Sequence, residues 1–135
     1  MNLAIIPARA GSKRIKNKNI VNFFGKPLIY NSIKIAIKSK LFDDVIVSTD
    51  SIKIQKIALK YGAKVYFKRP KSLSGDHTGT PSVINHAIKW VQKNLYNPIY
   101  VCCIYPTAVS LNETDIINAY KKIKTNKFNF VFPVN

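Results

Sequence analysis

Acidic residues, cysteines and long apolar runs are all scarce in this sequence. Its 22 Lys and Arg residues outnumber 6 Asp and Glu residues, which gives a formal net charge of +16 at pH 7. No apolar stretch approaches the roughly 18 residues of a membrane span. The apolar run near the N-terminus is interrupted by Arg9 too early for a secretory signal. These absences predict a cytosolic protein.

The two cysteines, Cys102 and Cys103, are adjacent in an apolar run. Neighbouring side chains of a strand point to opposite faces, so a disulfide between them is geometrically poor. Their spacing does not suit a metal site either. We expect two buried thiols that pack against helices on either side of a sheet.

The excess of positive charge is compatible with a nucleic-acid partner, because neutralising phosphates releases counterions. The Lys residues, however, are scattered along the expected helices, where a solvated polar face would place them. The sequence therefore favours solvated helix faces and leaves a functional basic patch as the alternative.

Short apolar runs alternate with amphipathic helical patterns along the whole chain. Strands are expected at 3–6, 45–48, 64–67, 99–104 and 128–134, and helices at 27–39, 51–61, 81–95 and 113–125. With 135 residues, 47% of them hydrophobic, the chain can form one compact domain over residues 1–135. The repetition predicts an α/β fold with a doubly wound, mostly parallel sheet.

The loop after the first expected strand, residues 8–19, carries the strongest functional signal. It combines five cations with Gly11, Ser12 and Asn19. Main-chain N–H groups at such a turn, surrounded by cationic side chains, can offset the charge of a triphosphate. Neither common phosphate fingerprint, G-x-x-x-x-G-K-[ST] or G-x-G-x-x-G, is present. A solvated cationic turn without a ligand is the alternative.

Topology predicts where this loop lies. In a doubly wound sheet, ligands bind beyond the carboxyl ends of the strands, where the strand order reverses. For the order 3-2-1-4-5, this crevice lies between the first and fourth strands. Loops 8–19 and 105–108 are therefore expected to meet at one cleft.

Four motifs follow one another in the chain: I-I-P-A-R-A-G-S-K-R-I-K-N-K-N at 5–19, F-G-K-P-L-I at 24–29, V-S-T-D at 47–50 and R-P-K-S-L at 69–73. Together they resemble the acylneuraminate cytidylyltransferases, which make CMP-activated nine-carbon sugar acids. Two further stretches, D-H-T-G-T at 76–80 and V-C-C-I-Y-P-T-A at 101–108, look more like the pseudaminic acid branch than the sialic acid branch.

The resemblance implies a Rossmann-like nucleotidyltransferase fold and transfer of CMP from CTP to a nine-carbon 2-keto sugar acid, with release of pyrophosphate. Pseudaminic acid is the expected acceptor, since Tyr105 stands where sialic-acid relatives place Gln. The alternatives are a CMP-sialic or CMP-legionaminic acid synthetase, and a noncatalytic basic fragment that binds nucleotides or nucleic acid. Because family members continue beyond the position matching Asn135, we expect a C-terminally truncated domain.

The resemblance also implies roles for individual residues. Arg9 and Lys13 are the expected catalytic contacts to the triphosphate, and Tyr105 and Thr107 are expected to face the sugar acid. The expected nucleotide-binding residues are Ala8, Gly11, Ser12, Lys18, Asn19, Arg69 and Thr80. A buried Asn19 amide would distinguish cytosine from uracil by leaving polar groups unpaired with the wrong base. A turn-stabilising role is the alternative for Asn19.

Asp50, Asp76 and His77 are the remaining polar candidates near the expected cleft, and Mg²⁺ is the expected metal. We expect Asp50 to cap the following helix rather than reach the cleft. Asp76 and His77 share a loop that could order around substrate, although a hydrogen-bonded loop role is favoured for His77 over catalysis. Mg²⁺ is the expected cofactor, but the family's acidic pair and its homodimer-forming segment lie beyond the position matching Asn135. No metal ligand is assigned here.

Overall fold

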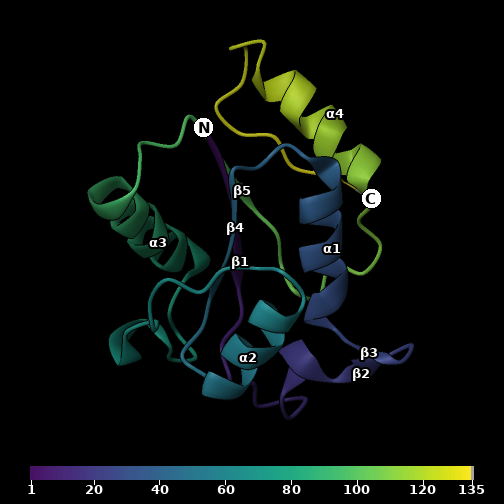
Figure 1. Cartoon of the computed structure of the whole chain (residues 1–135), viewed down its shortest axis with the longest axis vertical. Helices are drawn as coiled ribbons and strands as arrows, with labels where there is room; N and C mark the ends of the chain where they lie inside the picture. Colours follow the sequence, from purple (N-terminus) through teal and green to yellow (C-terminus); the bar gives the residue numbers. More distant parts are fainter. Residues whose placement is uncertain (135) are drawn as a thin grey trace.

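The computed structural model describes residues 1–134, and its centre is a sheet of three parallel strands (Figure 1). These are β1 (Asn2–Pro7), β4 (Asp44–Ser48) and β5 (Tyr100–Cys103), in the order β4-β1-β5. Strand β1 is central because four consecutive residues, Leu3 to Ile6, are fully buried. The first and fourth expected strands therefore lie side by side, as the predicted strand order requires.

Four α-helices cover the two faces of this sheet. They are α1 (Ile29–Ser39), α2 (Ile52–Lys60), α3 (Thr80–Asn94) and α4 (Glu113–Ile123). Alternate residues of β1 enter two separate cores, because successive side chains of a strand point to opposite faces. Ala4 and Ile6 pack in the core that contains residues of α1, α2 and α4, whereas Leu3 and Ile5 pack with residues of α3. Figure 1 shows α3 on one side of the sheet and α1 and α4 on the other, which confirms the predicted doubly wound α/β class.

Local signals set the helix ends. Ser51 is the N-cap of α2, and its side chain accepts a hydrogen bond from the backbone N–H of Ile54. Gly62, with a φ of +98°, follows the C-cap of that helix. Helix α4 begins with a capping box between Asn112 and Asp115. These caps explain why the expected helix boundaries are close to the observed ones.

The expected strand at 64–67 is wrong. Only Lys64 bridges to the sheet, opposite Ile46. The chain then leaves the ladder, because the Tyr66 ring stacks on Trp90 of α3 with a centroid distance of 5.1 Å. The Tyr66 hydroxyl also donates to the Asp44 carboxylate over 2.8 Å. Packing on α3 thus replaces strand pairing.

The expected strand at 128–134 is also absent. Among the described residues this segment pairs with no strand, and Phe130 and Phe132 are 85% and 74% exposed. Two short strands that the sequence did not predict, β2 (Asn22–Phe23) and β3 (Lys26–Pro27), form a hairpin ahead of α1. The helix expected from residue 27 therefore begins only at residue 29.

The remaining short elements are two 3₁₀-helices, η1 (Lys18–Ile20) and η2 (Lys71–Leu73). Both cysteines are free thiols, as expected, but only Cys102 is partly buried. Cys103 is exposed, because β5 is the edge strand of the sheet over residues 1–134. Across those residues no helix is long and apolar enough to cross a bilayer.

Candidate functional site

A pocket of about 170 Å³ opens beyond the carboxyl ends of β1 and β5. The loop after β1 and the loop after β5 both contribute to it, so the crevice predicted from topology is confirmed. The pocket is lined by Pro7, Arg9, Ser12, Lys18, Asn19, Arg69, Thr78, Thr80, Val83, Tyr105, Pro106 and Thr107.

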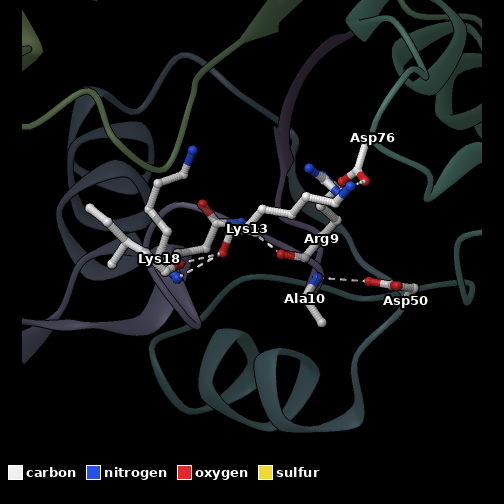
Figure 2. A network of polar contacts seen from close by, with 9 residues as sticks. Arg9, Ala10, Lys13, Lys18, Asp50 and Asp76 are labelled. Atoms are coloured by element: carbon white, nitrogen blue, oxygen red, sulfur yellow. Dashed lines mark hydrogen bonds and ion pairs between the residues drawn. The ribbon is translucent and has the colours of Figure 1, made fainter.

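Main-chain contacts with the end of β4 hold the start of the cationic loop. The backbone N–H of Ala8 donates to the Ser48 carbonyl over 2.9 Å. The backbone N–H of Ala10 donates to Asp50 Oδ1 over 3.0 Å, which Figure 2 shows. Asp50 is therefore an anchor of the loop. The helix-cap role expected for it is wrong, because Ser51 caps α2 instead.

Ser12 closes the loop on itself. Its hydroxyl donates to the Ile15 carbonyl over 2.8 Å and accepts from the backbone N–H of Lys18 over 3.1 Å. The Ser12 N–H donates to the carbonyl of Ala10 over 3.0 Å. Both donors of Ser12 thus serve the shape of the loop in this structure, and the Ser12 hydroxyl also holds the backbone of Lys18.

Arg9 and Lys13 meet at one carboxylate. Arg9 Nη1 lies 2.8 Å from Asp76 Oδ1, and Lys13 Nζ lies 2.8 Å from Asp76 Oδ2 (Figure 2). The hydrogen bond from Lys13, and to a smaller extent the one from Arg9, holds the pKa of Asp76 below its usual value. The sequence did not indicate this pairing, which joins residues 67 positions apart for Arg9 and Asp76.

Asn19 lies in η1 and is buried, with 7% of its surface exposed. Its Nδ2 donates to the Arg9 carbonyl over 2.9 Å. An amide carries two N–H donors and one carbonyl acceptor. Asn19 therefore stabilises the turn at Arg9 and still has hydrogen-bonding capacity for a ligand, so the two roles considered for it are compatible.

Arg69 forms a buried wall of the pocket and is only 4% exposed. Its guanidinium donates twice to Ser48, from Nε to Oγ over 3.1 Å and from Nη2 to the carbonyl over 2.7 Å. Burial lowers the pKa of Arg69. A side chain fixed in this way orients its remaining N–H groups, unlike a solvated loop cation.

Tyr105 and Thr80 close the pocket on the side of α3. The Tyr105 hydroxyl donates to Thr80 Oγ1 over 2.9 Å, and the Tyr105 carbonyl accepts from Ser32 Oγ over 2.7 Å. Tyr105 also lines a separate groove of about 470 Å³ between β5 and α4, which contains Leu111 and Ile116. One residue thus borders both cavities.

Most of the expected site residues gather in the pocket, and three do not line it. Ala8 is fully buried beneath the loop. Gly11 is exposed, and a Cβ there would meet Arg9 Nη1 at 3.3 Å. The Lys13 side chain is 80% exposed at the rim.

His77 is exposed on the loop that contains Asp76. The pocket is also lined by four residues that were not expected there, Pro7, Thr78, Val83 and Pro106, and all but Val83 belong to the quoted motifs.

The expected Mg²⁺ has no ligand cluster among the described residues near the pocket. Within residues 1–134 no group of three or more His, Cys, Asp or Glu side chains could hold a metal ion. Asp50 accepts the Ala10 N–H, and Asp76 is paired with Arg9 and Lys13. Mg²⁺ is usually bound through one or two carboxylates together with substrate phosphates, and in this structure the two carboxylates contact the loop instead.

A parallel sheet between two helical layers, with a cation-lined pocket at the strand ends, is typical of α/β proteins that bind nucleotides. The Cytidylyltransferase family model matches residues 3–135. The chain belongs to this family, which confirms the resemblance of its motifs.

Relatives at higher and lower identity agree with this assignment. Pseudaminic acid cytidylyltransferase of Campylobacter jejuni subsp. jejuni serotype O:2 is 49% identical over 133 residues, which are 97% of this chain and 56% of the relative. N-acylneuraminate cytidylyltransferase of Escherichia coli O18:K1:H7 is 37% identical over 124 residues, or 91% of this chain and 28% of the relative. The chain spans little more than half the length of the first of these relatives.

A solved structure supports the fold. The structure of CMP:2-keto-3-deoxy-manno-octonic acid synthetase complexed with CTP matches with a TM-score of 0.74 at 21% identity. The match covers 93% of this chain and 48% of that protein. The predicted nucleotidyltransferase fold is thereby confirmed.

Proposed function

We propose that this chain binds CTP and serves the transfer of CMP to a nine-carbon 2-keto sugar acid, with pseudaminic acid as the first candidate. The observation that carries the proposal is the pocket beyond the carboxyl ends of β1 and β5, which Arg9, Lys18 and Asn19 line together. The relative that is 49% identical bears the name pseudaminic acid cytidylyltransferase, which favours this acceptor over sialic acid.

Arg9, Lys13 and Lys18 would bind the triphosphate. Attack of the anomeric hydroxyl on the α-phosphorus expels pyrophosphate, so the protein must align nucleophile and leaving group and neutralise phosphate charge. Arg9 and Lys18 line the pocket. Lys13 lies at its rim, where it binds the same Asp76 carboxylate as Arg9 does. Cations held at the end of a strand provide this neutralisation without large rearrangement.

Asn19, Arg69 and Thr80 would bind the base. Asn19 is buried, with one N–H used by Arg9, and its remaining groups can pair with the amine and ring acceptor of cytosine. Uracil presents a carbonyl in place of the amine, so the same donors and acceptors would be mismatched. The buried guanidinium of Arg69 restricts where the ring can lie.

Tyr105 and Thr107 would contact the sugar acid, because both follow β5 and Tyr105 borders the second groove. Mg²⁺ remains the expected cofactor of the reaction, and no step is assigned to it because residues 1–134 contain no cluster of ligands for it. Homodimer formation stays a prediction.

Calorimetric titration with CTP and UTP tests the proposal. CTP is expected to bind more tightly than UTP, and Asn19→Ala is expected to reduce that difference. Equal affinities for the two nucleotides would contradict the base assignment, and undetectable binding of CTP would contradict the function itself. A pyrophosphate-release assay with CTP, Mg²⁺ and either pseudaminic or sialic acid then tests the acceptor.

A further inference from the structure

Asp76 places a negative charge where the proposed function requires positive charge to be available. Both of its carboxylate oxygens lie 2.8 Å from a cation, one from Arg9 and the other from Lys13. Figure 2 shows the carboxylate beside the ends of both cationic side chains, apart from Asp50. A carboxylate with two charge-assisted contacts resembles a phosphate group in the contacts it makes.

This contact lies at the rim, where exchange with a ligand is easy. The Arg9 and Asp76 side chains are 28% and 32% exposed, and exposed ion pairs are weak because water screens them. The loop that carries Asp76 is held by short-range contacts, such as Ser74 Oγ to the Pro70 carbonyl over 3.0 Å and Thr78 N–H to the Gly75 carbonyl over 3.3 Å. Neither contact depends on the ion pair.

We propose that Asp76 is a positioning residue that holds Arg9 and Lys13 together beside the pocket and is exchanged for the phosphates of the nucleotide when it binds. The proposal rests on the proposed function. The carboxylate keeps the two cations together and lowers the cost of gathering like charges. The phosphates must then displace it, which reduces the net gain on binding. Thr78 and Thr80 line the pocket just beyond Asp76, and their loop keeps its own contacts when the carboxylate is displaced.

Asp76→Asn tests the exchange, because it removes the charge and keeps the size of the side chain. Calorimetry with CTP and with cytidine, which lacks phosphates, is the measurement. CTP is expected to bind the variant roughly two- to fivefold more tightly than the wild-type chain. The affinity for cytidine is expected to be unchanged, a pattern that a merely structural role of Asp76 would not produce.

Two matched variants serve as controls. Asp76→Glu keeps the charge and should keep the wild-type affinity for CTP. Glu113→Gln in α4 removes one negative charge outside the pocket and should have no such effect. Equal or weaker CTP binding by Asp76→Asn, or an equal gain with cytidine or with Glu113→Gln, would overturn the exchange. Failure of the wild-type chain to bind CTP would instead count against the proposed function.

Discussion

The carboxylate of Asp50 accepts a hydrogen bond from the backbone N–H of Ala10, which lies 40 positions earlier in the chain. This contact joins the loop after β1 to the segment just beyond the end of β4. The loop therefore takes its shape at Ala10 from a neighbouring strand end as well as from its own sequence. Arg9, one residue before Ala10, is one of the cations that line the pocket.

Asp50→Ala is expected to weaken CTP binding, because the loop loses its anchor and Arg9 loses its fixed position. A hydrogen bond to a charged acceptor contributes on the order of 1.5–3 kcal/mol. Part of this loss appears as lower stability and part as lower affinity. Calorimetry with CTP and urea unfolding of the same protein separate the two.

Ser51→Ala is the matched control for Asp50→Ala. It removes the N-cap of α2, which costs about 1 kcal/mol of stability, and it leaves the Ala10 contact in place. CTP affinity should therefore stay close to that of the wild-type chain. If both variants lose the same affinity, Asp50 acts through α2 and the anchoring role is wrong.

Arg9→Ala is expected to reduce CTP affinity more than Lys13→Ala. Removal of one charge-assisted contact costs on the order of 1.5–3 kcal/mol, or roughly ten- to a hundredfold in affinity. The Arg9 side chain is 28% exposed whereas Lys13 is 80% exposed, so solvent screening reduces the contribution of Lys13. Titration calorimetry with CTP provides the ranking.

Lys93→Ala, in the last turn of α3, removes the same charge away from the pocket and should leave the affinity unchanged. A ranking in which Lys13 matters more than Arg9 would contradict the placement of Arg9 as the inner cation. Unchanged affinity in both folded variants would contradict phosphate binding by this loop.

The sheet and the crevice were predictable because they depend on patterns that act locally. The branched apolar run from Leu3 to Ile6 forms the central strand, and strand order then fixes which loops meet. The segment 64–67 shows where this reasoning fails. Its apolar pattern suits a strand, but the Tyr66 side chain contacts both Trp90 and Asp44, and residues so distant in sequence leave no local signal.

The hairpin before α1 escaped prediction for a conformational reason. Its two-residue turn places Phe24 at a φ of 51° and Gly25 at a φ of 83°. Such turns favour Asn, Asp or Gly at both positions, and Phe gives no such indication. In the site, Asp50 and Ser51 are both good caps on sequence alone. Only the position of Ala10 in three dimensions distinguishes them.

The pKa of Asp76 provides a direct test of its ion pairs in solution. Lys13 and Arg9 hold it below the ordinary value of 3.8, so the pairs are present above that value and are lost as the pH falls through the lowered pKa. NMR titration of the carboxyl carbons should find the midpoint of Asp76 below 3.8. Lys13→Ala should raise this midpoint, and Lys93→Ala should not. An unshifted midpoint in the wild-type chain would show that the pairs do not form in solution.

The chain is expected to prefer CTP to double-stranded DNA in spite of its net charge of +16. Lys residues lie on several helices, including Lys34 of α1, Lys56 of α2 and Lys93 of α3, so they form no single track for a phosphate backbone. Fluorescence competition at physiological salt checks this. Tight, steeply salt-dependent DNA binding that CTP cannot displace would favour the basic-module alternative.

Tyr105→Phe is expected to loosen the side of the pocket next to α3, because it deletes the hydroxyl that donates to Thr80 Oγ1 over 2.9 Å. A neutral hydrogen bond contributes about 0.5–1.5 kcal/mol, so urea unfolding should show a loss within that range. CTP affinity should fall as well, since Thr80 lines the pocket. Tyr120→Phe in α4 removes an equivalent hydroxyl away from the pocket and should change neither quantity. If Tyr105→Phe lowers stability but leaves CTP affinity intact, the link to Thr80 supports the fold and does not shape the nucleotide site.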